Sequence, residues 1–404
     1  MTLSIRPRPY VIPDYSLTGD LLAYLTCGLQ YRYYNKGSLP PSTPVQLWFG
    51  EFIHSVMEEA YLEWQHNQQR QRFPWSWDPD IRDIELQIDR RLRARGLYPP
   101  PRLFCPFTAS STTQGLCPDM SHPHQLIASM RTDAAINTWG QHLFPLISEA
   151  EVRLKSICDM PNYQSGVSRS NYYGITGVID VISSVNLATA PAGNLILHYI
   201  HEHSELRQAI DSLSSPEYEI IIDYKGMRRP AQRDAQNPNS MNPFWLRHEW
   251  QILTYAWLRS QQAQAKHVVA GILFYFNELA PSQEDMKELQ AEVQNNLTDI
   301  MPSGLDLRAV QGWRRRTQAP RLTRPFREQR SIRIIPVDTT HIQNSLRNFD
   351  SVVTEIENSV LSEMGGNAIL QCWRTNPIQR TCTACDFKTF CPNPAPRRYV
   401  PTVP

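Results

Sequence analysis

The sequence predicts a mixed α/β fold with a central sheet flanked by helices. Residues 151–157 alternate between apolar and polar side chains, and residues 172–185 are rich in β-branched residues. Residues 218–226 and 267–276 are apolar runs typical of buried strands. Between these two runs, residues 247–260 have helical periodicity. Strands that alternate with helices in this way indicate a mixed sheet covered by helices.

Elements near both ends of the chain complete the predicted core. An apolar stripe that begins after the N-cap candidates Ser16 and Thr18 predicts a helix to about residue 34. A second stripe predicts a helix over 45–64. Near the C-terminus, 330–338 has the pattern of a strand and 340–364 that of a helix.

We expect one module built from five parts. These are N-terminal helices over 1–65, an insertion over 66–148, the α/β core over 149–279, a polar insertion over 280–330, and a strand, a helix and a cysteine cluster over 331–404. A chain of 404 residues is long enough to bury one large core.

The bulk composition narrows the class of protein. With 41% hydrophobic and 20% charged residues, the chain is globular. Its 40 basic and 39 acidic residues argue against a protein that coats nucleic acid without specificity, but they permit a local basic groove. The sequence contains no apolar run of about eighteen residues and begins without the apolar core of a signal peptide. We therefore expect a cytoplasmic protein without a membrane span.

Two carboxylates and an amine mark the predicted strands. Asp180 lies within 172–185, and Asp223 lies within 218–226, two residues before Lys225. Side chains alternate along a strand, so residues 223 and 225 point to the same face. Charged groups on an otherwise apolar strand need a partner, an ion or an open cleft. A surface ion pair on an edge strand has the same D-x-K pattern, so the motif alone leaves both interpretations open.

This constellation suits the hydrolysis of phosphodiesters. Divalent ions held by carboxylates activate the attacking water and neutralise charge on phosphorus. Mg²⁺ or Mn²⁺ prefers oxygen ligands, which Asp180, Asp223 and the main-chain carbonyl of Tyr224 can supply. Lys225 is placed to hold the water or to stabilise the transition-state oxyanion.

Two helical motifs accompany the carboxylates. Gly50 and His54 form a G-x3-H step, and Gln251 and Tyr255 form Q-x3-Y on the helix that follows the strands. The order G-x3-H, G-x2-D, D-x-K and Q-x3-Y resembles the RecB-type nucleases of the PD-(D/E)xK superfamily. The resemblance covers the two ends of the chain and residues 149–275, and it implies a restriction-endonuclease-like core.

The resemblance also implies roles for the matching residues. In such nucleases the histidine and both acidic residues bind metal and the lysine assists the water, which assigns His54, Asp180, Asp223 and Lys225. The glutamine and tyrosine, here Gln251 and Tyr255, touch the DNA backbone or support the site.

Two features of the strands bear on this resemblance. The preceding strand of such nucleases often carries a glutamate, and both Glu149 and Glu151 are candidates. Asp180 and Asp223 are 43 positions apart (223 − 180), whereas relatives usually join these strands with a shorter turn. An insertion between the two strands accounts for this distance without moving either carboxylate.

Three cysteines crowd together near the C-terminus. Cys382, Cys385 and Cys391 form C-x2-C-x5-C and need a fourth ligand for a zinc ion or an iron–sulfur cubane. Cys372 is the nearest candidate in sequence, and its use would make a local zinc knuckle. Cys27, in the first predicted helix, is the distant candidate.

This cysteine pattern resembles the iron–sulfur branch of RecB-type nucleases, which includes CRISPR-adaptation nucleases and AddB-type domains. There one early cysteine and three late ones hold a 4Fe-4S cluster, which implies Cys27, Cys382, Cys385 and Cys391 as its ligands. Relatives often have proline after the first cysteine, where this chain has Gly28. Treated as a cross-link, such a closure removes about 5–6 kcal/mol of unfolded-chain entropy. The remaining cysteines are expected to be ordinary thiols: Cys105, Cys117, Cys158 and Cys372.

Other residues have two interpretations each. Five arginines either meet phosphates or form solvated basic faces: Arg228, Arg229 and 314–316. Three tryptophans around the Q-x3-Y helix either stack on unpaired bases or pack in the core: Trp245, Trp250 and Trp257.

The resemblance implies a metal-dependent DNA nuclease that acts on single strands or DNA ends within a repair or antiviral defence complex. The sequence has no G-x4-G-K-[ST] motif to power unwinding, so we expect a helicase, integrase or defence-complex partner. Two competing interpretations remain open. One is a non-catalytic DNA-binding or scaffolding subunit, and the other is a zinc protein with a fortuitous D-x-K.

Overall fold

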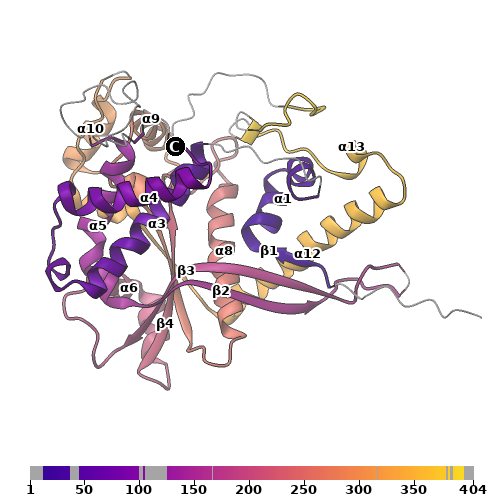
Figure 1. Cartoon of the computed structure of the whole chain (residues 1–404), viewed down its shortest axis with the longest axis horizontal. Helices are drawn as coiled ribbons and strands as arrows, with labels where there is room; N and C mark the ends of the chain where they lie inside the picture. The colour runs from indigo at the N-terminus through magenta and orange to yellow at the C-terminus, as the bar shows by residue number, and fades with distance from the viewer. Residues whose placement is uncertain are drawn as a thin grey trace, which may run out of the picture.

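A six-stranded mixed sheet forms the centre of the protein (Figure 1). The computed structural model describes residues 12–36, 45–99, 103–104, 125–165, 167–315, 317–378, 381–382 and 385–394. The strands are β1 (Asp14–Ser16), β2 (Ile147–Asp159), β3 (Tyr172–Asn186), β4 (Glu217–Lys225), β5 (Val268–Tyr275) and β6 (Ile332–Pro336). Their order is β1-β3-β4-β5-β6, and β2 pairs with β3. The predicted mixed α/β class is confirmed.

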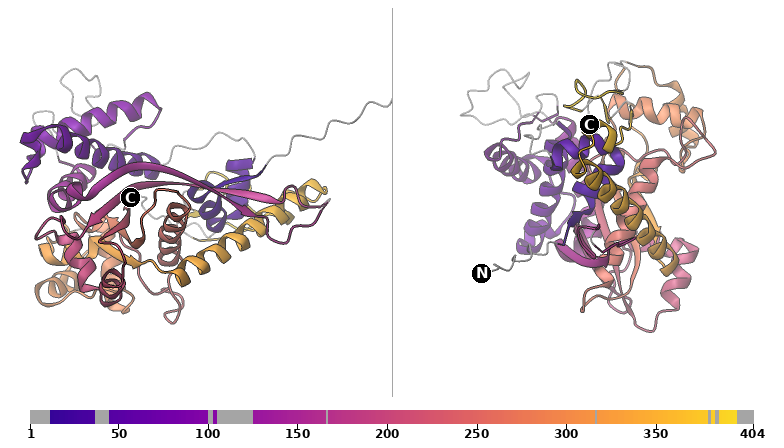
Figure 2. Two further views of the ribbon diagram at one scale, coloured as in Figure 1. Left: turned by 90° about the horizontal axis from the view of Figure 1, so that it is seen from below. Right: turned by 90° about the vertical axis from the view of Figure 1, so that its right-hand side faces the viewer.

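The pairing of β3 with its neighbours organises the sheet. β2 and β3 form a long antiparallel hairpin, which extends past the helices on one side of the molecule (Figures 1 and 2). β3 also pairs antiparallel with β4, from Val181 opposite Ile222 to Asn186 opposite Glu217. β4 then pairs parallel with β5, and β5 antiparallel with β6. The two predicted carboxylate strands are therefore neighbours.

Helices cover both faces of the sheet. They are α1 (Ala23–Thr26), α2 (Gly28–Tyr31), α3 (Val45–His66), α4 (Arg82–Ala94), α5 (Ile127–Leu143), α6 (Leu195–Glu202), α7 (Ser204–Asp211), α8 (Pro243–Ser260), α9 (Gln283–Gln294), α10 (Gly304–Gly312), α11 (Arg324–Ser331), α12 (Thr339–Met364) and α13 (Ile369–Cys372). Helices α3 to α7 pack on one face, and α8, α12 and the N-terminal helices pack on the other (Figure 2). None of these helices is both long and apolar enough to cross a membrane.

The segment expected to be an insertion, 66–148, contributes two packed helices. The amphipathic helix α4 buries Ile84, Ile88 and Leu92, and α5 buries Trp139, all in the same apolar cluster as α3. Their polar outer faces account for the hydrophilic appearance of this stretch of sequence. Cys105 and Cys117 lie outside the described residues.

The connection between β3 and β4 accounts for the distance between the two aspartates. It holds the short helices α6 and α7, which begin at Leu195 and Ser204 and pack into the cluster below α5. Because the helices lie on one face of the sheet, the connection lengthens without disturbing the β3–β4 register.

Residues from both ends of the chain lie side by side, indigo and yellow in Figure 1. Ser16 caps the first helical turn by accepting a hydrogen bond from the amide of Gly19, as its sequence predicts. The helix then breaks at Cys27, whose backbone is extended. Beyond the break, the Leu29 amide donates to the carbonyl of Arg374 at 2.9 Å. The break therefore docks the N-terminal helices onto the segment after α13.

The contact between β5 and α8 provides a test of this packing. Gly271 on β5 lies directly under Ile252, so a Cβ at this glycine would overlap the isoleucine side chain. Gly271→Ala should lower the free energy of unfolding by about 1–3 kcal/mol through overpacking. Denaturation in urea measures the change.

Gly312, at the end of α10, is the matched control for this substitution. A Cβ there would meet nothing within 4 Å, so Gly312→Ala should be neutral or slightly stabilising. If both alanine variants unfolded like the wild type, the packing of α8 against β5 would be wrong.

Candidate active site

One cleft of about 790 Å³ collects the residues that the sequence singled out. Its walls include the six predicted side chains, from α3, β3, β4 and α8: His54, Asp180, Asp223, Lys225, Gln251 and Tyr255. Tyr224, whose carbonyl was expected to bind metal, also lines the cleft. Residues that are up to 201 positions apart in sequence (255 − 54 = 201) thus meet at the carboxyl end of β4.

A hydrogen bond across the β3–β4 pair fixes Asp180. The Tyr224 amide donates to Asp180 Oδ2 at 2.6 Å, so one carboxylate oxygen is bound to the strand that carries the second carboxylate. The other oxygen, Oδ1, lies 3.4 Å from His54 Nδ1 on α3. Asp180 is buried, whereas His54 faces the cleft with about a third of its side chain exposed. Asp180 therefore links the sheet to α3.

A second network orients Lys225. Its Nζ lies 2.6 Å from Asp223 Oδ2 and donates to Gln251 Oε1 at 2.6 Å. The Gln251 amide donates in turn to Asp223 Oδ1 and to the hydroxyl of Tyr255. Asp223 Oδ2 is buried, and the Lys225 ammonium is its charged neighbour. Carboxylate oxygens at a cleft wall are suitable ligands for a hard cation.

Glu151 completes the group, and of the two glutamates considered it is the one in the cleft. It lies opposite Asp180 in the β2–β3 register, with a positive φ of 51°. One ligand atom each from Glu151, Asp180 and His54 lie within 4.8 Å of one another. Like charges directly opposite one another destabilise a strand pair unless a cation lies between them. Glu149, by contrast, pairs with Arg259 at 2.9 Å.

The electrostatics of the cleft show an excess of negative charge. Desolvation and the nearby Asp180 raise the pKa of Glu151 to about 7. Burial also raises the pKa of Asp223, to about 6, against the opposing effect of Lys225. Burial opposes the charged form of His54, but Asp180 outweighs it and raises the pKa of His54 to about 9. Without a metal ion, the negative charge of the cleft thus favours proton binding by these side chains. A bound divalent cation would neutralise the same negative charge and displace those protons.

Two motif glycines keep space for this arrangement. A Cβ at Gly177, three residues before Asp180, would lie 2.8 Å from the ring of Tyr255, so only glycine lets α8 approach β3 this closely. A Cβ at Gly50 would meet nothing within 4 Å, because this residue borders the open cleft. The first glycine is required for packing, and the second leaves room at the cleft.

The four predicted cluster cysteines line a separate small hollow. Cys27, at the helix break, faces the same hollow as Cys382, Cys385 and Cys391. Burial and the neighbouring thiols raise the pKa of Cys385, offset in part by a hydrogen bond from Phe387. Cys372 does not line this hollow; its thiol lies 3.3 Å from the Ser362 hydroxyl. The geometry thus groups the distant cysteine, rather than the nearest one, with the C-terminal three.

Several residues with two interpretations prove to be structural. Arg228 is buried and pairs with Glu292, and Arg229 pairs with Asp299, so neither is free to meet phosphates. The three tryptophans on α8 are less than a tenth exposed and do not offer stacking surfaces: Trp245, Trp250 and Trp257. Arg316 lies outside the described residues.

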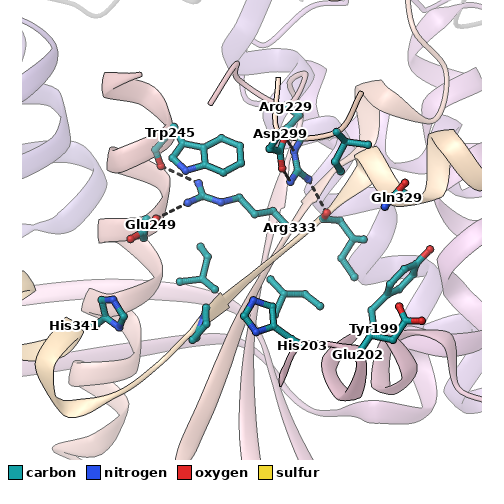
Figure 3. A pocket seen from close by; sticks show the side chains of 15 residues that line it. Tyr199, Glu202, His203, Arg229, Trp245, Glu249, Asp299, Gln329, Arg333 and His341 are labelled. Atoms are coloured by element: carbon teal, nitrogen blue, oxygen red, sulfur yellow. Dashed lines mark hydrogen bonds and ion pairs between the residues drawn. The ribbon is translucent and has the colours of Figure 1, made fainter. Parts of the chain in front are cut away.

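A second hollow, of about 320 Å³, lies beside β6 (Figure 3). Trp245 is flanked there by the guanidinium groups of Arg229 and Arg333, at 5.3 and 3.6 Å from its ring centroid. Asp299 and Glu249 neutralise these two arginines. Because the two arginines are already paired, their ion pairs connect α8 and β6. The hollow therefore lacks the excess of negative charge that characterises the cleft.

Comparison with known proteins bears on the C-terminal half of the chain. Residues 201–392 match the family described as the PD-(D/E)XK nuclease superfamily. The match contains Asp223, Lys225, Gln251 and the three late cysteines, while His54 and Asp180 precede it. No curated protein sequence matches the chain.

Removing Glu151 tests the cation-binding group. Glu151→Gln should weaken the binding of Mn²⁺ by at least about 10-fold, because one of the two carboxylates among its three donors is lost. Titration calorimetry on the purified protein measures this affinity. Glu149→Gln is the control, since Glu149 pairs with Arg259 outside the cleft. An equal loss in both variants would contradict the assignment.

Proposed function

We propose that this chain is a metal-dependent nuclease that hydrolyses phosphodiester bonds in the cleft between α3, β3, β4 and α8. The family match over residues 201–392 supports the nuclease class. The observation that carries the proposal is the convergence of His54, Glu151 and Asp180 within 4.8 Å, next to the Asp223–Lys225 pair. Carboxylates with an adjacent amine are the groups that metal-assisted phosphodiester hydrolysis requires.

The donor set fits a divalent cation. His54, Glu151 and Asp180 would hold it, together with the carboxylate of Asp223 and, as the sequence suggested, the Tyr224 carbonyl. These donors are mainly carboxylate oxygens, which suit Mg²⁺ or Mn²⁺. When bound, such an ion supplies Lewis acidity and lowers the pKa of a bound water.

The protein's own residues do the remaining work. Lys225 is held by Asp223 and Gln251 with its ammonium group at the cleft wall, where it donates a hydrogen bond to the attacking water or to a phosphoryl oxygen. Gln251 and Tyr255 are positioning residues, because their hydrogen bonds fix the carboxylate of Asp223. Asp180 holds His54 toward the cleft.

We extend the proposal to single-stranded DNA or DNA ends, and to a repair or defence complex with a helicase or integrase. The basis for this extension is the resemblance to RecB-type nucleases. The sequence lacks a P-loop lysine motif, so an ATP-driven partner would have to expose the strands.

We also propose that Cys27, Cys382, Cys385 and Cys391 hold a 4Fe-4S cluster. In support, the four side chains line one hollow although they come from both ends of the chain.

Substitution at β4 tests the catalytic proposal. Asp223→Asn and Lys225→Ala should each lower kcat for cleavage of a labelled single-stranded oligonucleotide by at least about 10²–10³-fold. Lys266→Ala is the matched control, because Lys266 pairs with Glu217 at the opposite end of the same strand. Full metal-dependent cleavage by Asp223→Asn would rule out the assignment.

Iron content tests the cluster proposal. Protein purified without oxygen should contain about four irons per chain and should be brown. Cys385→Ala should lose the iron and the colour, whereas Cys158→Ala, in β2, should keep both. A colourless wild type containing one zinc ion would show that the zinc alternative is correct.

A further inference from the structure

The outer face of α4 is rich in arginine. Its solvent-exposed side chains follow helical spacing and include Arg90, Arg91 and Arg95. The opposite face, with Ile84, Ile88 and Leu92, is buried in the core. None of these three arginines belongs to the proposed active site. They lie before the segment that matches the nuclease family.

Ion pairs connect this face to the mouth of the cleft. Arg95 Nη1 lies 2.9 Å from Glu51, which lines the cleft one helical turn before His54. Arg91 Nη1 lies 2.9 Å from Glu59, two turns further along α3. Helices α3 and α4 therefore run antiparallel, and the C-terminal end of α4 lies beside Glu51 of the cleft lining.

The cleft is negatively charged, so a polyanionic substrate needs a basic surface near it. Five carboxylates line the cleft, and only Lys225 and His54 oppose them among the described residues: Glu51, Glu58, Glu151, Asp180 and Asp223. A bound divalent ion offsets only part of this charge, so a phosphate chain needs cations nearby. The arginines of α4 lie at that position. In their pairs with Glu51 and Glu59 the arginine side chains are exposed, whereas the glutamates are partly buried, so each guanidinium keeps donors that can reach a phosphate.

An exposed aromatic ring follows α4 and contacts Arg93, a further arginine of this helix. Tyr98 follows α4 by four residues and is 64% exposed. The guanidinium of Arg93 lies 5.7 Å from its ring centroid and also pairs with Asp89, which fixes the position of the ring. An exposed ring beside cations is suited to stack on an unpaired base.

We propose that Arg90, Arg91 and Arg95, with Tyr98, bind the backbone and one base of a single-stranded nucleic acid that runs into the cleft. We call these four residues the α4 track. The inference rests on the proposed function and adds the path of its substrate. Continuity with the cleft selects nucleic acid over an acidic protein or a lipid surface.

The first test removes the arginines. Arg90→Ala/Arg91→Ala/Arg95→Ala should weaken binding of a labelled oligothymidylate by about 100-fold at 0.1 M salt, since each phosphate contact contributes about fivefold. The slope of log affinity against log salt should become shallower by about 2. Fluorescence anisotropy in EDTA measures binding without cleavage.

A matched triple variant controls for net charge. Arg207→Ala/Lys266→Ala/Arg347→Ala removes three cations from α7, the loop before β5, and α12. It should bind with nearly the wild-type affinity and salt slope. Equal losses in the two triple variants would mean that only overall charge matters, which would overturn the proposal.

Two substitutions separate a binding role from a merely structural one. Glu59→Gln removes the partner of Arg91 and should tighten binding by a few-fold, because the arginine no longer exchanges a carboxylate for a phosphate. Tyr98→Ala should weaken single-strand binding by about 5-fold or more and leave duplex binding unchanged, whereas Tyr98→Phe should retain stacking. If Glu59→Gln weakened binding, or Tyr98→Ala had no effect, the track would be wrong.

Binding and cleavage also distinguish this inference from the proposed function. A wild type that binds oligothymidylate through the track yet never cleaves it refutes the nuclease and leaves the track intact. A wild type that cleaves, alongside a triple variant that binds and cleaves equally well, refutes the track alone. Capture by anionic vesicles instead of oligothymidylate, lost in the triple variant, would assign the arginines to a lipid surface and overturn the proposal.

Discussion

The hydrogen bond from the Tyr224 amide to Asp180 is the contact on which the rest of the site depends. It joins the two strands that carry the acidic residues, and it uses a main-chain donor, so no side-chain substitution at Tyr224 removes it. Asp180 then has one oxygen bound to β4 and the other facing His54 on α3. The antiparallel register of β3 and β4 thereby decides which face of the sheet bears the charge and which helices can reach it.

The sequence predicted the components of the site better than their surroundings. The spacing of Asp223 and Lys225 requires a shared face in any strand, so their juxtaposition follows from alternation alone. Glu151 could not be chosen over Glu149, because the positive φ that accompanies its placement has no sequence signal in a non-glycine residue. The arginines after β4 had the composition of a phosphate site, but the carboxylates that bury Arg228 lie 60 or more residues away. Such long-range pairing is not visible in local sequence.

The apolar clusters that hold the helices on the sheet are separate from the cleft that contains the candidate site. One apolar cluster, between α3, α4, α5 and the sheet, sets the position of His54, and the other, between α8, α12 and the sheet, sets those of Gln251 and Tyr255. The cleft opens where these two layers diverge at the end of β4. Buried ion pairs stabilise the neighbouring elements; Arg330 on α11, for example, pairs with Glu278 just after β5. The candidate site residues therefore lie on helices and strands rather than on loops.

The docking of α1 and α2 against the chain beyond α12 has a consequence for biosynthesis. Arg32 binds Glu363 across 331 positions, and Leu29 binds Arg374. A ribosome delivers the N-terminal partner of each contact first, so these two contacts form only after almost the whole polypeptide has been made. The cluster that contains Leu21, Leu29 and Tyr31 is therefore completed last, when the chain beyond α12 arrives.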